Sequence, residues 1–259
     1  MLLSGLPRTG STLLVALLTQ NPLIYGEGAS ALCQFMWEAK QVCEDTTALQ
    51  SNNRLHTGHD ILSSLPGIYY KDVQRPIIIE KGRTWVHPAN FTIWQEHINA
   101  EQKMVVLVRP IDQIVRSFVS LRHRNGLTGD LWSDLFEPGS EPLMRAVDAI
   151  YVARQQPTDK ILFIEYRDLV ANPASVLRSI YNHYGWDHFE HWFDNIAQLN
   201  PENDEAHNLK GMHEIRASIS TRDIDVELPD DVLIACKQLN SLLGFDDEKF
   251  NAINNKETR

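Results

Sequence analysis

The chain has 259 residues, 43% of them hydrophobic, and a formal net charge of −10. That length and composition are sufficient for one large α/β domain, and we expect a single domain over residues 1–259. An acidic protein lacks the basic face that sequence-independent nucleic-acid binding requires, so nucleic acid is not an expected partner.

The sequence shows no sign of a membrane or secreted protein. No apolar run approaches the roughly 20 residues of a membrane span, and residues 1–6 run into a polar loop without a signal-peptide cleavage pattern. The cysteines Cys33, Cys43 and Cys236 fit neither a disulfide framework nor a zinc spacing. We therefore expect a soluble, cytoplasmic protein with reduced thiols and no membrane partner, whose polar residues 250–259 form a frayed tail.

Four short apolar runs predict buried strands at residues 2–5, 76–80, 104–108 and 161–164. Continuous runs of Ile, Val and Leu are typical of parallel strands covered on both faces. Helical patterns lie between them at residues 11–20, 31–44, 111–122 and 173–184, and residues 125–141 and 200–208 read as surface loops. The alternation predicts an α/β fold, a P-loop-type doubly wound parallel sheet with helices on both faces.

The segment Gly5-Leu6-Pro7-Arg8-Thr9-Gly10-Ser11-Thr12 joins the first predicted strand to the first predicted helix. Such a loop builds an anion cradle, because its backbone N–H groups and the helix N-terminus point at the ligand. The Gly5–Gly10 spacing matches a nucleoside-triphosphate P-loop, but Ser11 stands where that loop has lysine. Arg8 instead places a cation inside the loop, so the sequence predicts an anion site and disfavours triphosphate chemistry.

The stretch Leu6-Pro7-Arg8-Thr9-Gly10-Ser11-Thr12-Leu13-Leu14 resembles the 5′-phosphosulfate loop of the sulfotransferase superfamily. It is closer to the tyrosylprotein and bacterial branches (Pro-Arg-Ser-Gly-Thr/Ser-Thr-Leu) than to the cytosolic branch (Pro-Lys-Ser-Gly-Thr-Thr-Trp). The resemblance implies the donor 3′-phosphoadenosine-5′-phosphosulfate (PAPS). Its 5′-phosphosulfate would be held by Pro7, Arg8, Thr9, Gly10, Ser11 and Thr12.

Arg109 follows the strand at residues 104–108, and Ser117 follows it by eight positions on the next predicted helix. In the sulfotransferase family this arrangement binds the 3′-phosphate. The chemistry agrees, because an arginine at the carboxyl end of a parallel strand lies where ligands bind and can form a forked contact with a phosphate. Arg109 and Ser117 are therefore the predicted 3′-phosphate site.

Lys81 ends the second predicted strand, where related sulfotransferases place a lysine against the bridging oxygen and the sulfuryl group. Sulfuryl transfer needs an in-line nucleophile, a stabilised leaving oxygen and positive charge near the equatorial oxygens. Lys81 and Arg8 are predicted to supply that charge, and we expect no metal.

The general base has several candidates. Arg83 occupies the position of the cytosolic branch's catalytic histidine, two residues after the lysine. Glu27 matches the glutamate of the tyrosylprotein branch with a one-residue shift, and its carboxylate can accept the proton of an acceptor hydroxyl. His56, His59 and His87 remain alternatives.

Two later segments complete the expected site. Residues 163–173 are similar to the family's Tyr-Glu-Asp-Leu-Val-x-x-Pro segment, which implies that Tyr166 contacts the adenine. Residues 209–216 resemble the flexible late segment that closes on the nucleotide. Within it, Lys210 and Arg216 are predicted to reach the 3′-phosphate or the ribose.

Three functional hypotheses follow. The first is a PAPS-dependent sulfotransferase that acts by in-line displacement on a hydroxyl of a small molecule, carbohydrate or peptide. The second is a P-loop nucleotide or small-molecule kinase, which the missing loop lysine and the missing strand-end carboxylate for Mg²⁺ disfavour. The third is a catalytically inactive nucleotide-binding protein of the same fold.

Overall fold

The computed structural model describes residues 1–156, 158–220 and 224–245. The expected frayed tail, residues 250–259, lies outside the described residues. Within the described part of the chain, no helix is both long enough and apolar enough to cross a membrane.

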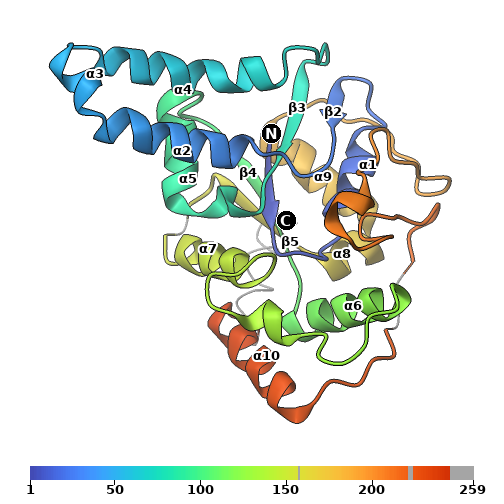
Figure 1. The fold of residues 1–259 in the computed structure, drawn as a ribbon. Helices are drawn as coiled ribbons and strands as arrows, with labels where there is room; N and C mark the ends of the chain where they lie inside the picture. The colour runs from blue at the N-terminus through green and yellow to red at the C-terminus, as the bar shows by residue number, and fades with distance from the viewer. Residues whose placement is uncertain (157, 221–223, 246–259) are drawn as a thin grey trace.

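The centre of the molecule is a parallel sheet of five strands in the order β2-β3-β1-β4-β5 (Figure 1). The strands are β1 (Leu2–Gly5), β2 (Ile24–Gly26), β3 (Ile77–Lys81), β4 (Met104–Val108) and β5 (Ile161–Glu165). β1 pairs with β3 on one side and with β4 on the other. β2 and β3 therefore lie on one side of β1, and β4 and β5 lie on the other. In such sheets the ligand crevice forms where the strand order reverses, so we expect it at the carboxyl ends of β1 and β4.

β4 shows why both faces of the sheet are covered. Met104, Val106 and Val108 belong to one hydrophobic core, while Val105 and Leu107 belong to the other. All five side chains are buried, as alternation along a strand between two helical layers requires. The predicted doubly wound α/β sheet is therefore confirmed.

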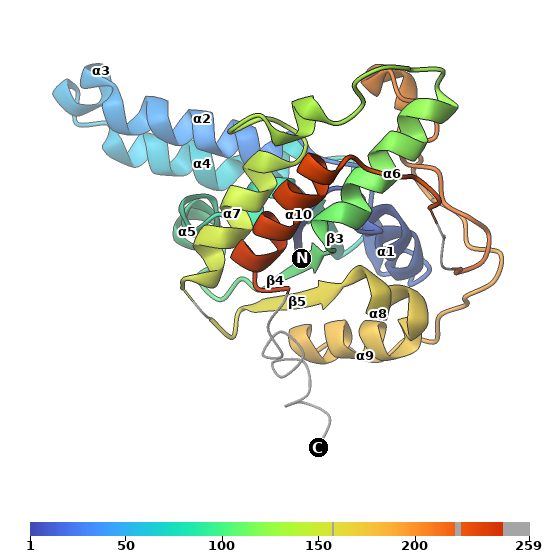
Figure 2. The same cartoon turned by 90° about the horizontal axis from the view of Figure 1, so that it is seen from below.

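Helices form a layer on each face, as Figure 2 shows around β4 and β5. α8 (Tyr166–Ala171) and α9 (Pro173–Tyr184) lie on one side, and α1 (Ser11–Leu18) shares their core. The other side carries α6 (Ile111–Arg124), α7 (Met144–Arg154) and α10 (Asp230–Leu242). α5 (Pro88–His97) packs into the same core as these three helices.

α2 (Leu32–Asp45) and α4 (Leu55–Tyr69) run side by side as an arm that projects from the body, with α3 (Thr47–Ser51) at its tip (Figure 1). Short 3₁₀ helices occur at η1 (Arg83–Val86), η2 (Ser133–Phe136) and η3 (Asp204–His207). η2 and η3 interrupt the two segments that the sequence predicted to be loops.

Most predicted elements are confirmed with small changes at their ends. The predicted helix at residues 11–20 ends at Leu18, and the one at 111–122 continues to Arg124. The sequence patterns did not identify β2, α4, α5, α7 or α10.

Candidate active site

The loop between β1 and α1 contains positive φ angles, which residues other than glycine rarely adopt. Gly5, Arg8 and Gly10 have φ values of 143, 59 and 78°. A Cβ at Gly5 would lie 2.2 Å from the carbonyl oxygen of Leu107, so β1 approaches β4 closely here. Gly10 caps α1 without a side-chain hydrogen bond, which leaves the first N–H groups of that helix available to an anion.

The two predicted anion motifs meet in space. Arg8 Nε donates to Ser117 Oγ at 3.1 Å, and Arg109 Nη1 donates to the carbonyl oxygen of Arg8 at 2.9 Å. The Arg109 guanidinium also lies over the ring of Tyr166, 4.2 Å from its centroid. Residues from three separate segments of the sequence therefore form one continuous surface.

Arg109 is 7% exposed, and its charge makes that burial informative. Its hydrogen bonds run to Gln113 Oε1 at 3.2 Å and to the Arg8 carbonyl, and neither oxygen is charged. A buried guanidinium is costly to desolvate unless an anion compensates it. The site therefore fits an anionic ligand better than a neutral one.

Lys81 ends β3 and is paired with a residue that sequence reasoning did not identify. Its Nζ donates to Glu202 Oε1 at 2.9 Å, and each of the two side chains is 11% exposed. Burial lowers the pKa of Lys81, and the charge of Glu202 opposes that shift. Burial alone would raise the pKa of Glu202, but Lys81, His213 and the backbone of Ala29 together hold that pKa below its usual value.

The predicted site residues surround one pocket at the carboxyl ends of β1, β3 and β4. Its lining includes Pro7, Arg8, Thr9, Gly10, Ser11, Thr12, Lys81, Arg109, Ser117, Tyr166 and Arg216. Arg83 and His213 also line it. The pocket is thus predominantly basic, in a chain whose net charge is −10.

Glu27 and Lys210 occupy other positions. The Glu27 carboxylate accepts a hydrogen bond from the Tyr25 hydroxyl at 2.7 Å, and it lines a smaller pocket with Gly28 and Glu202. Burial, assisted by Glu27, raises the pKa of Tyr25 to about 12. The side chain of Lys210 is exposed, and its backbone N–H donates to Asn125 Oδ1 at 2.9 Å.

The three histidines named from the sequence are also placed elsewhere. His87 caps α5 by accepting from the backbone N–H of Ala89 at 3.2 Å. A ring nitrogen of His59 lies 2.8 Å from one of His97, and His56 is exposed.

The histidine that does line the pocket is His213. Its Nδ1 lies 2.8 Å from Asp204 Oδ1, and its Nε2 lies 3.4 Å from Glu202 Oε2. Burial lowers the pKa of His213, while Glu202 and Asp204 act in the opposite direction. The only sequence signal for this group is the likeness of residues 209–216 to a closing segment, because the surrounding chain has no regular periodicity.

The structure is thus a P-loop-type α/β protein with a basic pocket at the carboxyl ends of its strands. Comparison with known proteins indicates a more specific family. Residues 97–191 match the family described as the Sulfotransferase family. That span contains Arg109, Ser117 and Tyr166, and it excludes the β1–α1 loop and Lys81. No curated protein matches the sequence.

Solved structures extend the similarity over nearly the whole chain. The sulfotransferase domain from the curacin biosynthetic pathway has a TM-score of 0.52 at 17% identity, covering 93% of this chain and 96% of that one. The sulfotransferase domain of the Synechococcus PCC 7002 olefin synthase gives 0.50 at 15% identity, covering 93% and 92%. A sulfotransferase from Alicyclobacillus acidocaldarius gives 0.53 at 12% identity, also covering 93% and 92%. The expected resemblance to sulfotransferases is confirmed by the family match over residues 97–191, and the solved structures show that the fold is shared.

Proposed function

We propose that this protein is a sulfotransferase that moves a sulfuryl group from PAPS to an acceptor hydroxyl. The observation that carries the proposal is the basic pocket, in which Arg8, Lys81 and Arg109 converge on the phosphate loop of an otherwise acidic protein. A donor with phosphates at both its 5′ and 3′ positions matches two cationic centres that are separate in sequence and adjacent in space.

The donor would lie across the carboxyl ends of β1 and β4. The N-terminus of α1 and the loop at residues 7–12 would hold the 5′-phosphosulfate, through backbone N–H groups and the hydroxyls of Ser11 and Thr12. Arg109 and Ser117 would hold the 3′-phosphate, because both lie in the same lining and are linked through Arg8. Tyr166 would present its ring to the adenine.

In the transfer step, the acceptor oxygen attacks sulfur and a new oxygen–sulfur bond forms. The bond from sulfur to the bridging oxygen breaks, and its electron pair stays on the 5′-phosphate of the product, 3′-phosphoadenosine-5′-phosphate (PAP). Lys81 and Arg8 would stabilise the negative charge that develops on the leaving oxygen and the sulfuryl oxygens. Lys81 would then exchange its contact with Glu202 for one with the donor.

The acceptor must lose a proton in this step, and Glu27 is the proposed base. Glu27 lines the smaller pocket, and Thr12 lines both that pocket and the main one. An acceptor hydroxyl that reaches Thr12 from the main pocket would therefore lie between Glu27 and the phosphate loop. Glu27→Gln is expected to reduce turnover by about 100-fold while PAP binding stays unchanged, and Glu38→Gln, an exposed glutamate on α2, is the matched control.

Two measurements test the proposed activity. PAP should raise the melting temperature and ATP with Mg²⁺ should not; stabilisation by ATP alone would support the kinase alternative instead. Incubation with radiolabelled PAPS and a panel of hydroxyl acceptors should give a labelled product together with PAP. PAP binding without any release of sulfate from PAPS would leave the inactive nucleotide-binding protein as the better description.

A further inference from the structure

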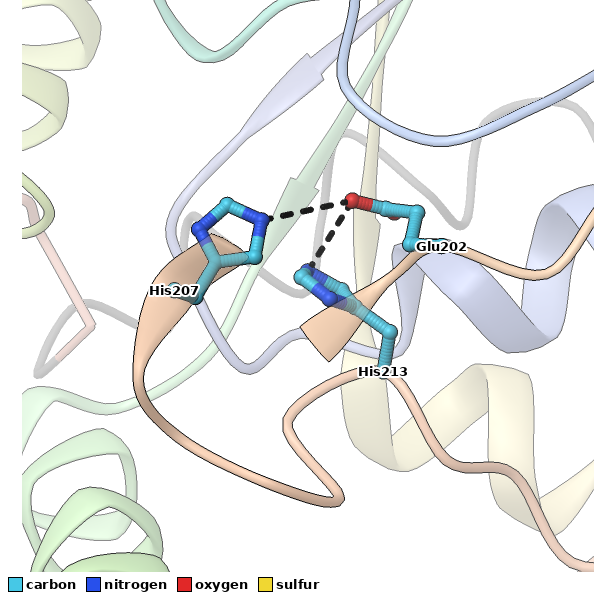
Figure 3. A group of neighbouring side chains, drawn as sticks. All are labelled: Glu202, His207 and His213. Carbon is cyan, nitrogen blue, oxygen red and sulfur yellow. Dashed lines mark ion pairs between the residues drawn. The ribbon is translucent and has the colours of Figure 1, made fainter. Parts of the chain in front are cut away.

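Three potential metal ligands converge beside the basic pocket, in a segment to which the sequence assigned no metal. Glu202, His207 and His213 come from η3 and the loops on either side of it (Figure 3). Both histidines direct Nε2 toward the same carboxylate oxygen, Glu202 Oε2, at 3.9 Å for His207 and 3.4 Å for His213. All three ligand atoms lie within 4.8 Å of one another.

These separations are close to those of a tetrahedral zinc site. Zinc binds nitrogen and oxygen ligands at roughly 2.0–2.1 Å, which places neighbouring ligand atoms about 3.3 Å apart. The His213–Glu202 pair already has this spacing, at 3.4 Å. His207 needs a shift of roughly half an ångström to reach the same spacing, and its side chain is 42% exposed.

The group around His213 is arranged as it is in known metal sites. Asp204 Oδ1 lies 2.8 Å from His213 Nδ1, and Asp204 Oδ2 accepts the backbone N–H of His213 at 3.2 Å. A carboxylate on the far nitrogen of a ligating histidine fixes the ring and its tautomer. In the tautomer with its proton on Nδ1, that proton is directed to Asp204 and Nε2 presents its lone pair to Glu202.

That lone pair faces an oxygen that is also an acceptor. Glu202 carries a negative charge, and Lys81 neutralises the carboxylate from the other oxygen, Oε1. Two acceptor atoms at 3.4 Å are stable only with a proton or a cation between them. A cation between His213 Nε2 and Glu202 Oε2 would satisfy both atoms, and His207 Nε2 faces the same carboxylate oxygen as a third ligand.

We propose that Glu202, His207 and His213 bind a zinc-type divalent transition-metal ion. Two imidazoles and one carboxylate are a ligand set suited to zinc, and the exposed side of His207 leaves a fourth position open to water. The ion would tie η3 to the segment that lines the basic pocket at His213. The site follows from these side chains alone and does not depend on the proposed sulfuryl transfer.

The test is metal titration of the whole chain after treatment with a chelator. Calorimetry with Zn²⁺ should give one saturable equivalent, and Co²⁺ should give the visible absorption of a four-coordinate complex. His207→Ala and His213→Ala should each weaken Zn²⁺ binding at least about tenfold, and Asp204→Asn should weaken it by about 10- to 100-fold. His207→Ala is the primary variant, because an exposed side chain can be removed without unfolding the protein.

His56→Ala is the control, since His56 is exposed on the distant α4 and should not affect binding. Absence of a saturable equivalent in the parent protein would overturn the proposal. So would equal affinity in the parent, His207→Ala and His213→Ala proteins, which would indicate adventitious surface binding. An imidazole NMR spectrum showing His213 doubly protonated at neutral pH, unchanged by Zn²⁺, would assign the space between the acceptors to a proton instead.

Discussion

The two sides of the pocket are built in different ways. The donor side consists of the loop at residues 5–12, Lys81 at the end of β3, Arg109 directly after β4 and Ser117 within α6. The other side is the stretch at residues 198–220, which includes residues 209–216, predicted to close on the nucleotide, and which we call the closing segment. It contains only the short η3 among its described secondary structure. Hydrogen bonds between residues that are distant in the sequence hold it in place. Lys81 donates to Glu202, and the Arg8 side chain donates to the carbonyl oxygen of Met212.

This difference separates the residues that bind and act on the ligand from those that stabilise the pocket wall. The parallel strands position the donor-side cations independently of the closing segment, because hydrogen bonding in the sheet fixes where each strand ends. The closing segment supplies the counter-ion of Lys81, because Glu202 accepts its hydrogen bond, and it contributes His213 to the pocket wall. Changes on the donor side should therefore affect ligand binding and turnover directly, whereas changes in the closing segment should first affect stability.

The largest effect is expected at Lys81. Lys81→Ala should reduce turnover of PAPS by about 100- to 1000-fold, because the developing charge on the leaving oxygen loses its cation. The affinity for PAP should change by less than about threefold, since the phosphates are held elsewhere. Turnover is measured as PAP release, and binding by calorimetry.

Lys71→Ala, an exposed lysine near β3, serves as the control and should behave like the parent protein. If Lys81→Ala retained full turnover, the lysine would be only a partner of Glu202.

The closing segment is tested next, through Glu202→Gln in chelator-treated protein. The buried ammonium of Lys81 loses its counter-charge while the amide oxygen can still accept its hydrogen bond, so we expect a loss of about 2 kcal/mol in the free energy of unfolding. Urea denaturation measures it, with Glu205→Gln, an exposed neighbour, as the control. Equal stability of the two variants would show that the ion pair does not hold the segment.

A smaller effect on ligand binding is expected when alanine replaces Gly10, in comparison with Gly126, a glycine of the same backbone conformation. Gly10 and Gly126 have φ values of 78 and 77°, so alanine at either position should cost about 1 kcal/mol of backbone strain. A Cβ at Gly10 would also lie 3.0 Å from the Tyr166 ring, whereas nothing lies within 4 Å of one at Gly126. Gly10→Ala alone should therefore weaken PAP binding. Equal affinity in both variants would remove Tyr166 from the nucleotide site.

The last prediction concerns the interior behind Lys81. Burial raises the pKa of Glu80 from the ordinary value of 4.5, and hydrogen bonds from Tyr70 and Trp85 limit the rise. The folded state therefore holds the proton of Glu80 more tightly than the unfolded chain does. Its contribution to stability is complete below pH 4.5 and is lost as pH rises through the higher folded-state pKa.

Glu80→Gln cannot lose a proton, so its stability relative to the parent protein should rise between pH 4.5 and neutrality. Each unit by which the pKa is raised corresponds to about 1.4 kcal/mol. Urea denaturation across this range measures the difference, with the exposed Glu190→Gln as the reference. A difference independent of pH would mean that Glu80 has the same pKa folded and unfolded.

The donor side could be predicted from sequence because its signals are local. The β1–α1 loop is one continuous motif, and Arg109 and Ser117 are separated by a fixed number of helical positions that the structure preserves. Their convergence required only that the strands be parallel. The fold was predictable for the same reason, since β1, β3, β4 and β5 are continuous apolar runs.

The other elements and site residues could not be predicted, because they depend on tertiary packing and have no recognisable local sequence pattern. α4 contains Pro66 in its interior, and its packing on α2 maintains the helix. β2 is a three-residue edge strand that is too short to show periodicity. Asp204 and His213 meet across an irregular loop, and Glu202 pairs with a lysine 121 positions away, so their association appears only in three dimensions.

The central claim is that this pocket recognises a nucleotide through its 3′-phosphate, and calorimetry of two ligands tests it most directly. PAP and adenosine 5′-monophosphate differ only in that phosphate. The parent protein should bind PAP more tightly, and Arg109→Ala should weaken PAP binding about 10- to 100-fold while leaving adenosine 5′-monophosphate almost unaffected. Equal affinity of the parent protein for the two nucleotides, or equal losses for both in Arg109→Ala, would contradict the account.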